Sequence, residues 1–149
     1  MDITYSTNKE DLAGLKVTGF FEGWQDKPDE NILRRSIENA DYIVLAIDTE
    51  KKKLAGYITA LSDGVLAAYI PFLEVEKTYQ HNSVGHTLVS KMLEQLSHLY
   101  MIDLVCDKEL AGFYTEAGFK SWHAMIKRNY ANQSGHRAGS ANRVDSRCR

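Results

Sequence analysis

Several features that mark other classes of protein are scarce or missing in this chain of 149 residues. It has only two cysteines, Cys106 and Cys148, which do not make a disulfide framework, so we expect one buried and one dangling thiol in a reducing cytoplasm. No apolar run is long enough to cross a bilayer, and the first ten residues lack the character of a signal peptide. These absences predict a cytoplasmic protein that has no membrane partner.

Motifs for metal binding and for several kinds of catalysis are also missing. The five histidines are scattered without the spacing of metal ligands, and the cysteines form no Cys-x-x-Cys pair, so we expect no metal. The sequence has neither a Gly-Lys-Ser/Thr phosphate loop nor a Gly-x-Ser-x-Gly nucleophile motif. The known catalytic classes that depend on those motifs are therefore not indicated.

Net charge is small, at −2, and it is unevenly distributed. Residues 131–149 contain four Arg and one Asp, a net +3, so residues 1–130 carry −5. A mildly acidic body argues against nucleic acid as a main partner and is compatible with a cationic amine substrate.

What remains is the composition of an ordinary globular domain, with 44% hydrophobic and 26% charged residues. We assign residues 1–130 to one domain, which is long enough to bury a hydrophobic core without stabilisation by disulfides or metal ions. Residues 131–149 are polar and nearly free of large apolar side chains, which predicts a disordered tail, either native or artificial in origin.

The order of predicted elements is that of an α+β fold on one mixed sheet. Strands are expected at Asp2–Tyr5, Tyr42–Ile47, Leu54–Leu61, Ala67–Val75, Ile102–Cys106, Phe119–His123 and Ala124–Tyr130. Helices are expected over residues 8–19, from Pro28 to beyond Ile37, from Gly85 to about Leu99 and over Lys108–Ala117. Pro71 interrupts a strand, so we expect a bulge or a splayed edge there, with backbone groups left free for a peptide-like ligand.

A polar turn, Gln80–Gly85, connects the strand Ala67–Val75 to the helix that follows. The N-terminus of a helix presents free backbone N–H groups and the positive end of the helix dipole. Because small residues let a ligand approach the backbone closely, this turn is a candidate phosphate-binding site.

Two motifs stand out in this part of the sequence. The first runs Leu73-x-Val75, then Tyr79-Gln80-x-x-Ser83-x-Gly85, and the second runs Phe113-Tyr114-x-x-x-Gly118-Phe119. Both resemble motifs of the GCN5-related N-acetyltransferase (GNAT) family. The first is similar to the family's acyl-CoA loop, Arg/Gln-x-x-Gly-x-Gly/Ala, with Ser83 in place of the first glycine. Serine is strained at that position if the loop requires a positive φ.

The resemblance implies the GNAT fold over about residues 2–130, in which the sheet opens into a V and acyl-CoA lies in the gap. The implied co-substrate is acetyl-CoA. Its implied binding residues are Leu73, Val75, Gln80, His81, Asn82, Ser83, Val84, Gly85, His86 and Asp107. Asp107 replaces an asparagine that is common in relatives, which removes an amide donor while keeping a helix cap.

Catalytic roles are also implied by the resemblance. Tyr114 corresponds to the family's usual general acid, and a phenol is a sensible proton donor to a departing thiolate; alone, it would be read as a core tyrosine. Glu74 is the carboxylate in the right strand for a general base, and a surface or salt-bridged residue is the equal alternative. Phe21, Glu22 and Trp24 fall where the acceptor pocket is usually built, although aromatic residues there serve equally well as core.

The sequence therefore predicts an N-acetyltransferase that moves acetyl from acetyl-CoA directly to an amine of a small molecule or peptide, without a covalent enzyme intermediate. Two alternatives remain open at this point. One is a non-catalytic acyl-CoA-binding sensor or regulatory protein on the same fold, and the other is an interaction protein whose turn binds nothing. The acceptor is not defined, and a homodimer is the arrangement that relatives often adopt.

Overall fold

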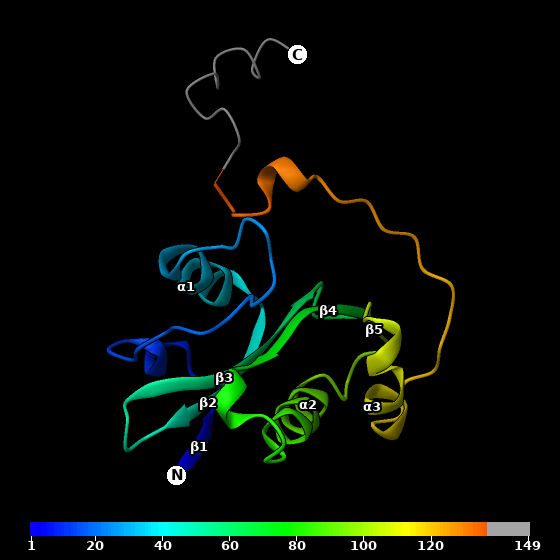
Figure 1. Ribbon diagram of the computed structural model, residues 1–149. Coiled ribbons are helices and arrows are strands. Elements are labelled where there is room, and N and C mark those ends of the chain that lie inside the picture. The colour runs from blue at the N-terminus through cyan, green and yellow to red at the C-terminus, as the bar shows by residue number, and fades with distance from the viewer. Residues whose placement is uncertain (137–149) are drawn as a thin grey trace.

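The computed structural model describes residues 1–136, and its centre is a five-stranded mixed sheet in the order β1-β2-β3-β4-β5 (Figure 1). The strands are β1 Ile3–Ser6, β2 Tyr42–Asp48, β3 Lys53–Ser62, β4 Ala67–Val75 and β5 Met101–Leu104. The first four strands pair antiparallel with their neighbours, while β4 and β5 pair parallel. The predicted α+β class and the predicted positions of these five strands are confirmed.

Helices cover both faces of the sheet. The α-helices are α1 Glu30–Asn39, α2 Val84–Gln95 and α3 Ala111–Glu116, and the 3-10 helices are η1 Lys9–Leu12, η2 Lys77–Tyr79, η3 Lys108–Leu110 and η4 Tyr130–Asn132. α1 lies on one face, and α2 with α3 lies on the other (Figure 1). The predicted helix over Lys108–Ala117 is thus divided between η3 and α3, and Gly118 ends it at φ +96° as expected.

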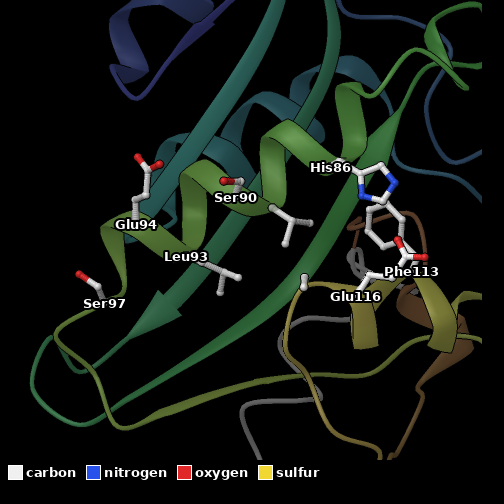
Figure 2. A pocket seen from close by; sticks show the side chains of 9 residues that line it. His86, Ser90, Leu93, Glu94, Ser97, Phe113 and Glu116 are labelled. Atoms are coloured by element: carbon white, nitrogen blue, oxygen red, sulfur yellow. The ribbon is translucent and has the colours of Figure 1, made fainter.

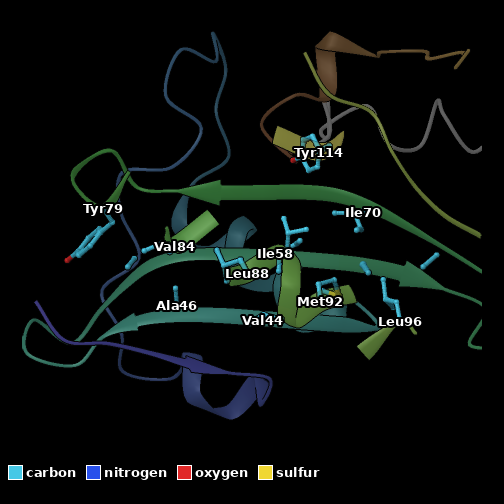
Figure 3. Packing of buried hydrophobic residues seen from close by; sticks show 14 of the residues in the cluster. Val44, Ala46, Ile58, Ile70, Tyr79, Val84, Leu88, Met92, Leu96 and Tyr114 are labelled. Carbon is cyan, nitrogen blue, oxygen red and sulfur yellow. The ribbon is translucent and has the colours of Figure 1, made fainter. Parts of the chain in front are cut away.

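Alternation along the central strands divides the core into two clusters. The cluster under α2 and α3 includes Val44, Ile58, Leu88, Met92 and Tyr114 (Figure 3). The cluster under α1 includes Leu33, Ile37, Ile43, Leu45 and Tyr57. Since successive strand residues point to opposite faces, neighbouring positions such as 43 and 44 enter different clusters. Each fully buried Leu or Met contributes roughly 1.5–3 kcal/mol.

β4 separates from β5 halfway along its length. Parallel pairing runs from Ala67 to Ile70 opposite Met101–Leu104 and stops just before Pro71, which has no N–H to continue a ladder. On the other side of β4 the register with β3 shifts at the same place, as a bulge does. Within the described residues, 71–75 therefore have no strand partner on the β5 side, and the predicted bulge and splay are confirmed.

The predicted helix over residues 8–19 is wrong. Asn8 is the N-cap of η1, and its side chain accepts a hydrogen bond from the Glu10 N–H at 2.9 Å. The helical segment ends at Leu12, and Gly14 follows with φ +77°. Beyond it Lys16 bonds to the start of β3, where the Leu54 N–H donates to the Lys16 carbonyl at 2.9 Å. Sheet-like bonding thus replaces the last two turns of the expected helix.

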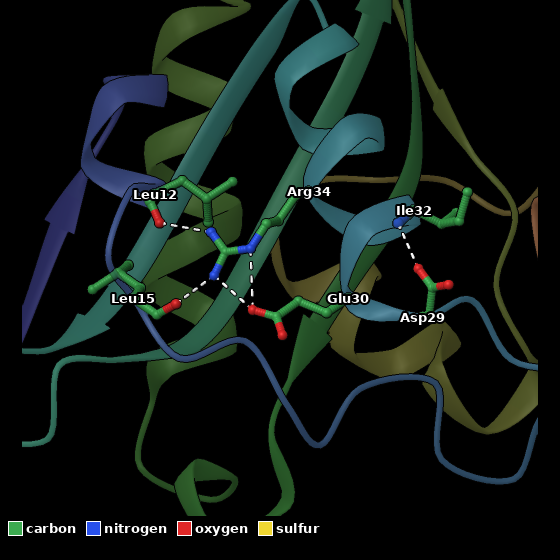
Figure 4. Close-up of polar contacts among 6 residues, drawn as sticks. All are labelled: Leu12, Leu15, Asp29, Glu30, Ile32 and Arg34. Atoms are coloured by element: carbon green, nitrogen blue, oxygen red, sulfur yellow. Dashed lines mark hydrogen bonds and ion pairs between the residues drawn. The ribbon is translucent and has the colours of Figure 1, made fainter.

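Arg34 of α1 holds this loop in place (Figure 4). Its guanidinium donates to the carbonyl oxygens of Leu12, at 3.0 Å, and of Leu15, and it also pairs with Glu30 at 2.7 Å. Asp29 caps α1 by accepting from the Ile32 N–H at 2.9 Å. Because one guanidinium binds two carbonyl oxygens of the loop, it fixes the position of the segment that leads to Phe21.

The two predicted strands at Phe119–His123 and Ala124–Tyr130 are also wrong. Residues 119–129, which we call the strap, run as an extended arc beside the domain instead (Figure 1). The backbone of this segment is extended, as a strand would be, but a strand also requires a neighbouring strand. Within residues 1–136 the strap has none.

The chain after the strap returns to the start of α1. The Gln133 side-chain oxygen accepts from the Asp26 N–H at 3.1 Å, and His136 Nε2 lies 2.9 Å from Asp29 Oδ2. Residues 131–136 of the predicted tail therefore have defined contacts, while residues 137–149, including Cys148, lie outside the described residues. Cys106 is a free, half-buried thiol. No helix among the described residues has the length and apolar character needed to span a membrane.

Candidate active site

The turn between β4 and α2 has an unusual backbone. His81 and Ser83 both lie in the left-handed region, with φ of 63° and 62°. Ser83 is the N-cap of α2, yet its side chain makes no capping hydrogen bond; its carbonyl oxygen instead accepts from the Thr87 N–H and hydroxyl, both at 3.0 Å. The sequence-based concern that serine is strained here is confirmed. Two non-glycine residues at positive φ in one short loop make this turn a candidate ligand site.

In this conformation a series of consecutive main-chain N–H groups is available to donate hydrogen bonds to a ligand. Among the described residues, the main-chain N–H groups of residues 81–86 donate to no protein acceptor, whereas the Gln80 N–H already bonds to the Lys77 carbonyl at 3.3 Å. These groups lie at the N-terminus of the 12-residue helix α2, where the dipole adds positive potential. An anion such as a pyrophosphate is the ligand that suits them.

Replacing Ser83 by glycine should raise the free energy of unfolding by about 1 kcal/mol, because glycine adopts positive φ without a Cβ clash. Urea unfolding measures the change. Ser90→Gly is the matched control, since Ser90 is an exposed residue inside α2 and the same substitution there should destabilise by about 0.5–1 kcal/mol. Equal destabilisation by both variants would show that Ser83 is not strained.

A buried hydrogen bond between Tyr79 and Asp48 fixes the start of the loop. The Tyr79 hydroxyl donates to Asp48 Oδ2 at 2.7 Å, and both side chains are almost fully buried. Burial and the carboxylate raise the pKa of Tyr79 to about 12, and the hydrogen bond lowers the pKa of Asp48. Gln80 then reaches back to donate to the Val75 carbonyl at 2.9 Å, which fastens the loop to the end of β4.

A cavity of about 560 Å³ lies between α2 and α3 (Figure 2). Its walls include His86 and Phe113, whose ring centroids are 4.5 Å apart. A Cβ added at Gly85 would lie 3.5 Å from Phe113 and 3.8 Å from Val75, so a larger side chain would crowd this junction. His86 lines the cavity and also carries the last of the free N–H groups, so the cavity adjoins the loop at this residue.

Tyr114 lies on α3 next to Phe113, which lines the cavity. Its ring packs against Phe113 and Phe119, with centroids 5.0 and 5.8 Å away. The hydroxyl makes no hydrogen bond to any described residue, and burial, with a contribution from Cys106, raises its pKa to about 12. The phenol is therefore protonated throughout the physiological pH range and has a free proton to donate.

Glu74 points to the opposite face of the sheet from its neighbours Leu73 and Val75. Its two carboxylate oxygens accept separate hydrogen bonds, one from the Phe21 N–H and one from the Tyr57 hydroxyl, both at 2.9 Å. Burial raises the pKa of Glu74 in spite of these bonds, and burial with the carboxylate raises the pKa of Tyr57 well above its usual value. A carboxylate with a raised pKa is a better proton acceptor near neutral pH.

Aromatic rings surround the approach to Glu74. Phe21 packs against Trp24 and Phe72, with centroid distances of 4.7 and 5.7 Å, and Trp24 remains 39% exposed. Phe21 has φ of 59°, which is uncommon for a bulky residue and is held by its bond to Glu74. Glu22 is exposed and its side chain forms no hydrogen bond or ion pair with the described residues.

Two residues of this group, Phe72 and Tyr57, were not predicted from the sequence, although a feature of the strands indicates each of them. Phe72 lies two residues before Glu74 on β4, so it shares the same face of the strand. Tyr57 pairs with Glu74 in the β3–β4 register. Recognising Tyr57 required that register, which the bulge at Pro71 made difficult to read from the sequence.

Asp107 follows β5 as the N-cap of η3, but its side chain makes no capping hydrogen bond, so that part of the prediction is wrong. The Leu110 N–H bonds to the Asp107 main-chain carbonyl at 2.9 Å instead, which leaves the carboxylate exposed. Residues 1–136 contain no cluster of His, Cys, Asp or Glu that could hold a metal.

The arrangement has one proton acceptor and one proton donor on opposite faces of a split sheet. Glu74 and the aromatic group lie on the α1 face, and Tyr114 lies on the α2–α3 face. β4, which carries Glu74, is unpaired on its β5 side from Pro71 to Val75 among the described residues. The free N–H groups of residues 81–86, the Glu74 carboxylate and the Tyr114 phenol are the candidate groups for a ligand in this gap.

Comparisons with known proteins agree with this geometry. The sequence profile of the acetyltransferase (GNAT) family matches residues 9–119. A protein from Deinococcus radiodurans R1, whose crystal structure is named that of a putative acetyltransferase, is 38% identical, with a TM-score of 0.79 and 89% of this chain and 92% of that chain covered.

More distant structures share the fold. A GNAT-family acetyltransferase from Streptococcus pneumoniae TIGR4 is 23% identical, with 86% of this chain and 98% of that chain covered and a TM-score of 0.64. Glucosamine-6-phosphate N-acetyltransferase from Arabidopsis thaliana is 16% identical, with 87% and 99% covered and a TM-score of 0.61. No curated protein matched the sequence. The chain belongs to the GNAT acetyltransferase family.

Proposed function

We propose that this protein transfers an acetyl group from acetyl-CoA directly to an amine of a small molecule or peptide. The observation that carries the proposal is the run of N–H groups at residues 81–86, which opens beside the unpaired half of β4. Acetyl-CoA has a pyrophosphate that can accept hydrogen bonds from these N–H groups, and it has amide groups that can pair with the free edge of β4. Membership of the family supports the same activity.

Three groups of residues would hold acetyl-CoA. The backbone N–H groups of residues 81–86 would bind the pyrophosphate. The main chain at Leu73 and Val75 would pair with the pantetheine amides, as a peptide does at a free strand edge. Asp107 lies at the end of the strand that forms the other side of the gap, although its exposed carboxylate has no amide proton to donate.

Glu74 and Tyr114 would manage the two protons of the reaction. A primary ammonium must lose a proton before its nitrogen attacks the thioester carbon, and Glu74 is the buried carboxylate that would accept it. As the new N–C bond forms and the C–S bond breaks, the sulfur leaves as a thiolate, and the Tyr114 phenol would supply its proton. The acetyl group moves in a single displacement, so no enzyme nucleophile is required.

The acceptor would approach from the α1 face, where Phe21, Trp24 and Phe72 lie beside Glu74. Aromatic faces attract a cation, and the carboxylate adds a favourable charge. Glu22, on the same loop, is exposed and adds negative charge at the entrance. This group suits an amine that arrives protonated.

Two measurements test the function. Calorimetry should show that acetyl-CoA binds and that acetyl-pantetheine, which lacks the nucleotide and pyrophosphate, binds about 100-fold more weakly, as expected when several charge-assisted contacts are lost. An amine panel with detection of free thiol should then show CoA release that depends on the amine. Binding without release for any amine would favour the acyl-CoA sensor, and failure to bind acetyl-CoA would favour the interaction protein.

A further inference from the structure

Tyr57 lies in the middle of β3, and its side chain is fully buried. Its ring packs edge-on against Phe20, with the two ring centroids 5.3 Å apart. Its hydroxyl donates to Glu74 Oε2 at 2.9 Å. A buried hydroxyl requires a hydrogen-bond partner, but a neutral acceptor such as a main-chain carbonyl would satisfy it. Because the acceptor is instead the candidate base, the contact points to a role in the reaction.

The Glu74 carboxylate is held at both of its oxygens. Oε1 accepts from the Phe21 N–H and Oε2 accepts from the Tyr57 hydroxyl, each at 2.9 Å. Because one donor comes from the loop before α1 and the other from β3, the two bonds fix the carboxylate in one orientation. Each carboxylate oxygen has two lone pairs, so each keeps one that can accept a proton from a ligand. The carboxylate is therefore fixed and still able to act as a base.

Burial and the two hydrogen bonds act on Glu74 in opposite directions. Burial has the larger effect and raises the pKa of Glu74, because it favours the neutral carboxylic acid. The bonds from the Phe21 N–H and the Tyr57 hydroxyl favour the ionised carboxylate and lower the pKa. A neutral carboxylic acid cannot accept a proton from an ammonium group. Loss of either donor would therefore leave a larger fraction of Glu74 unable to act as a base.

The other charged groups on the neighbouring elements are exposed or paired with one another. Charged side chains on the loop before α1 and on α1 are exposed, as Glu22 is, except for Arg34, which pairs with Glu30. In β3, Lys53 pairs with Glu76. None of these groups contributes to the pKa of Glu74. Tyr57 is thus the one side chain among residues 1–136 that stabilises the ionised form of Glu74.

We propose that Tyr57 is a positioning residue for acetyl transfer, whose hydroxyl keeps the Glu74 carboxylate ionised and oriented to accept the proton of the amine. This inference rests on the proposed function, because it concerns the proton that the acceptor loses. When the N–H bond of the ammonium breaks, the proton passes to an oxygen of Glu74. Tyr57 keeps its own proton, since burial and the carboxylate hold the pKa of Tyr57 well above its usual value. Tyr57 therefore acts through Glu74.

Tyr57→Phe removes the hydroxyl and keeps the ring that packs on Phe20, so the variant should fold, as circular dichroism will show. NMR of a chain labelled with ¹³C at the glutamate carboxyl carbons measures the ionisation of Glu74, whose signal is the one that Glu74→Gln removes. In Tyr57→Phe the titration midpoint should move to higher pH by about one pH unit, as expected for one hydrogen bond to a charged group. Tyr42→Phe is the matched control and should leave the midpoint unchanged, because Tyr42 packs on the opposite face of the sheet.

The rate of acetyl transfer should follow the same shift. In Tyr57→Phe the low-pH limb of kcat/KM should move to higher pH by the same amount, so activity below the limb should fall about tenfold. Well above the limb the rate should approach that of wild type. In a Glu74→Gln background the same substitution should change the residual rate little, since Tyr57 acts through Glu74.

A packing role for Tyr57 predicts different results. An unchanged titration midpoint of Glu74 in Tyr57→Phe would overturn the proposal. So would an equal loss of rate at every pH, or the same loss with and without Glu74→Gln. A wild-type chain that releases no CoA with any amine would instead refute the proposed function, and this failure is distinguishable because the carboxyl titration requires no acceptor.

Discussion

Replacing Glu74 by glutamine should lower kcat/KM about 100-fold at neutral pH, the lower end of the range for a lost general base. Glutamine keeps the size and shape of the side chain, and its oxygen can still accept from the Phe21 N–H. What it lacks is the ability to take the proton of the amine. The loss should therefore fall on the chemical step while affinity for acetyl-CoA stays the same, which calorimetry measures.

The pH profile makes this test specific. Burial raises the pKa of Glu74 above its usual value, so wild-type activity should rise with pH through that raised pKa as the carboxylate ionises. The Glu74→Gln variant should lose this low-pH limb. Glu38→Gln removes an exposed carboxylate from α1, outside the proposed site, and should leave both the rate and the limb as they are.

Stability gives an independent readout of the same group. Because the folded-state pKa of Glu74 is raised, the folded chain binds this proton more tightly than the unfolded chain does. The stabilisation that the protonated group provides is present below the unfolded pKa and is lost as pH rises through the folded pKa. Wild type should thus lose stability relative to Glu74→Gln over that window. Full activity with an unchanged pH limb would show that Glu74 only fastens Phe21.

The parts of the fold that the sequence predicts well are those decided locally. β3 and β4 are long, rich in β-branched and aromatic residues, and bounded by a charged turn and by Gly64, so their positions follow from pattern alone. Pro71 likewise indicates the splay because the missing N–H is a property of one residue. The strain at Ser83 was foreseeable because a loop position usually filled by glycine implies positive φ.

The parts that it predicts poorly depend on distant partners. Nothing near Lys16 in sequence indicates that its backbone will bond to Lys52 and Leu54, which ends the expected helix early. The association of Glu74 with Tyr57 and Phe21 likewise depends on strand register and on a loop 53 residues away. The expected final strands failed for the same reason, because whether an extended segment becomes a strand depends on where an edge is available.

Replacing Tyr114 by phenylalanine should lower kcat about 100-fold, since it removes only the hydroxyl that would protonate the thiolate. The ring keeps its contacts with Phe113 and Phe119, so stability and the affinity for acetyl-CoA should change little. Tyr5→Phe removes a tyrosine hydroxyl from β1, far from the gap, and is the matched control.

The raised pKa of Tyr114 decides how this loss depends on pH. With a pKa of about 12 the phenol stays protonated in every practical assay, so kcat of the variant should be lower by the same factor from mildly acidic to mildly basic pH. A thiol has a pKa near 8.5, so transfer from the phenol is uphill in free energy, which is why the effect lies at the lower end for a general acid. The combined effect with Glu74→Gln should be close to multiplicative, since the two groups act on different protons. An unchanged kcat, measured where chemistry limits the rate, would mean that solvent protonates the thiolate and that Tyr114 serves only in packing.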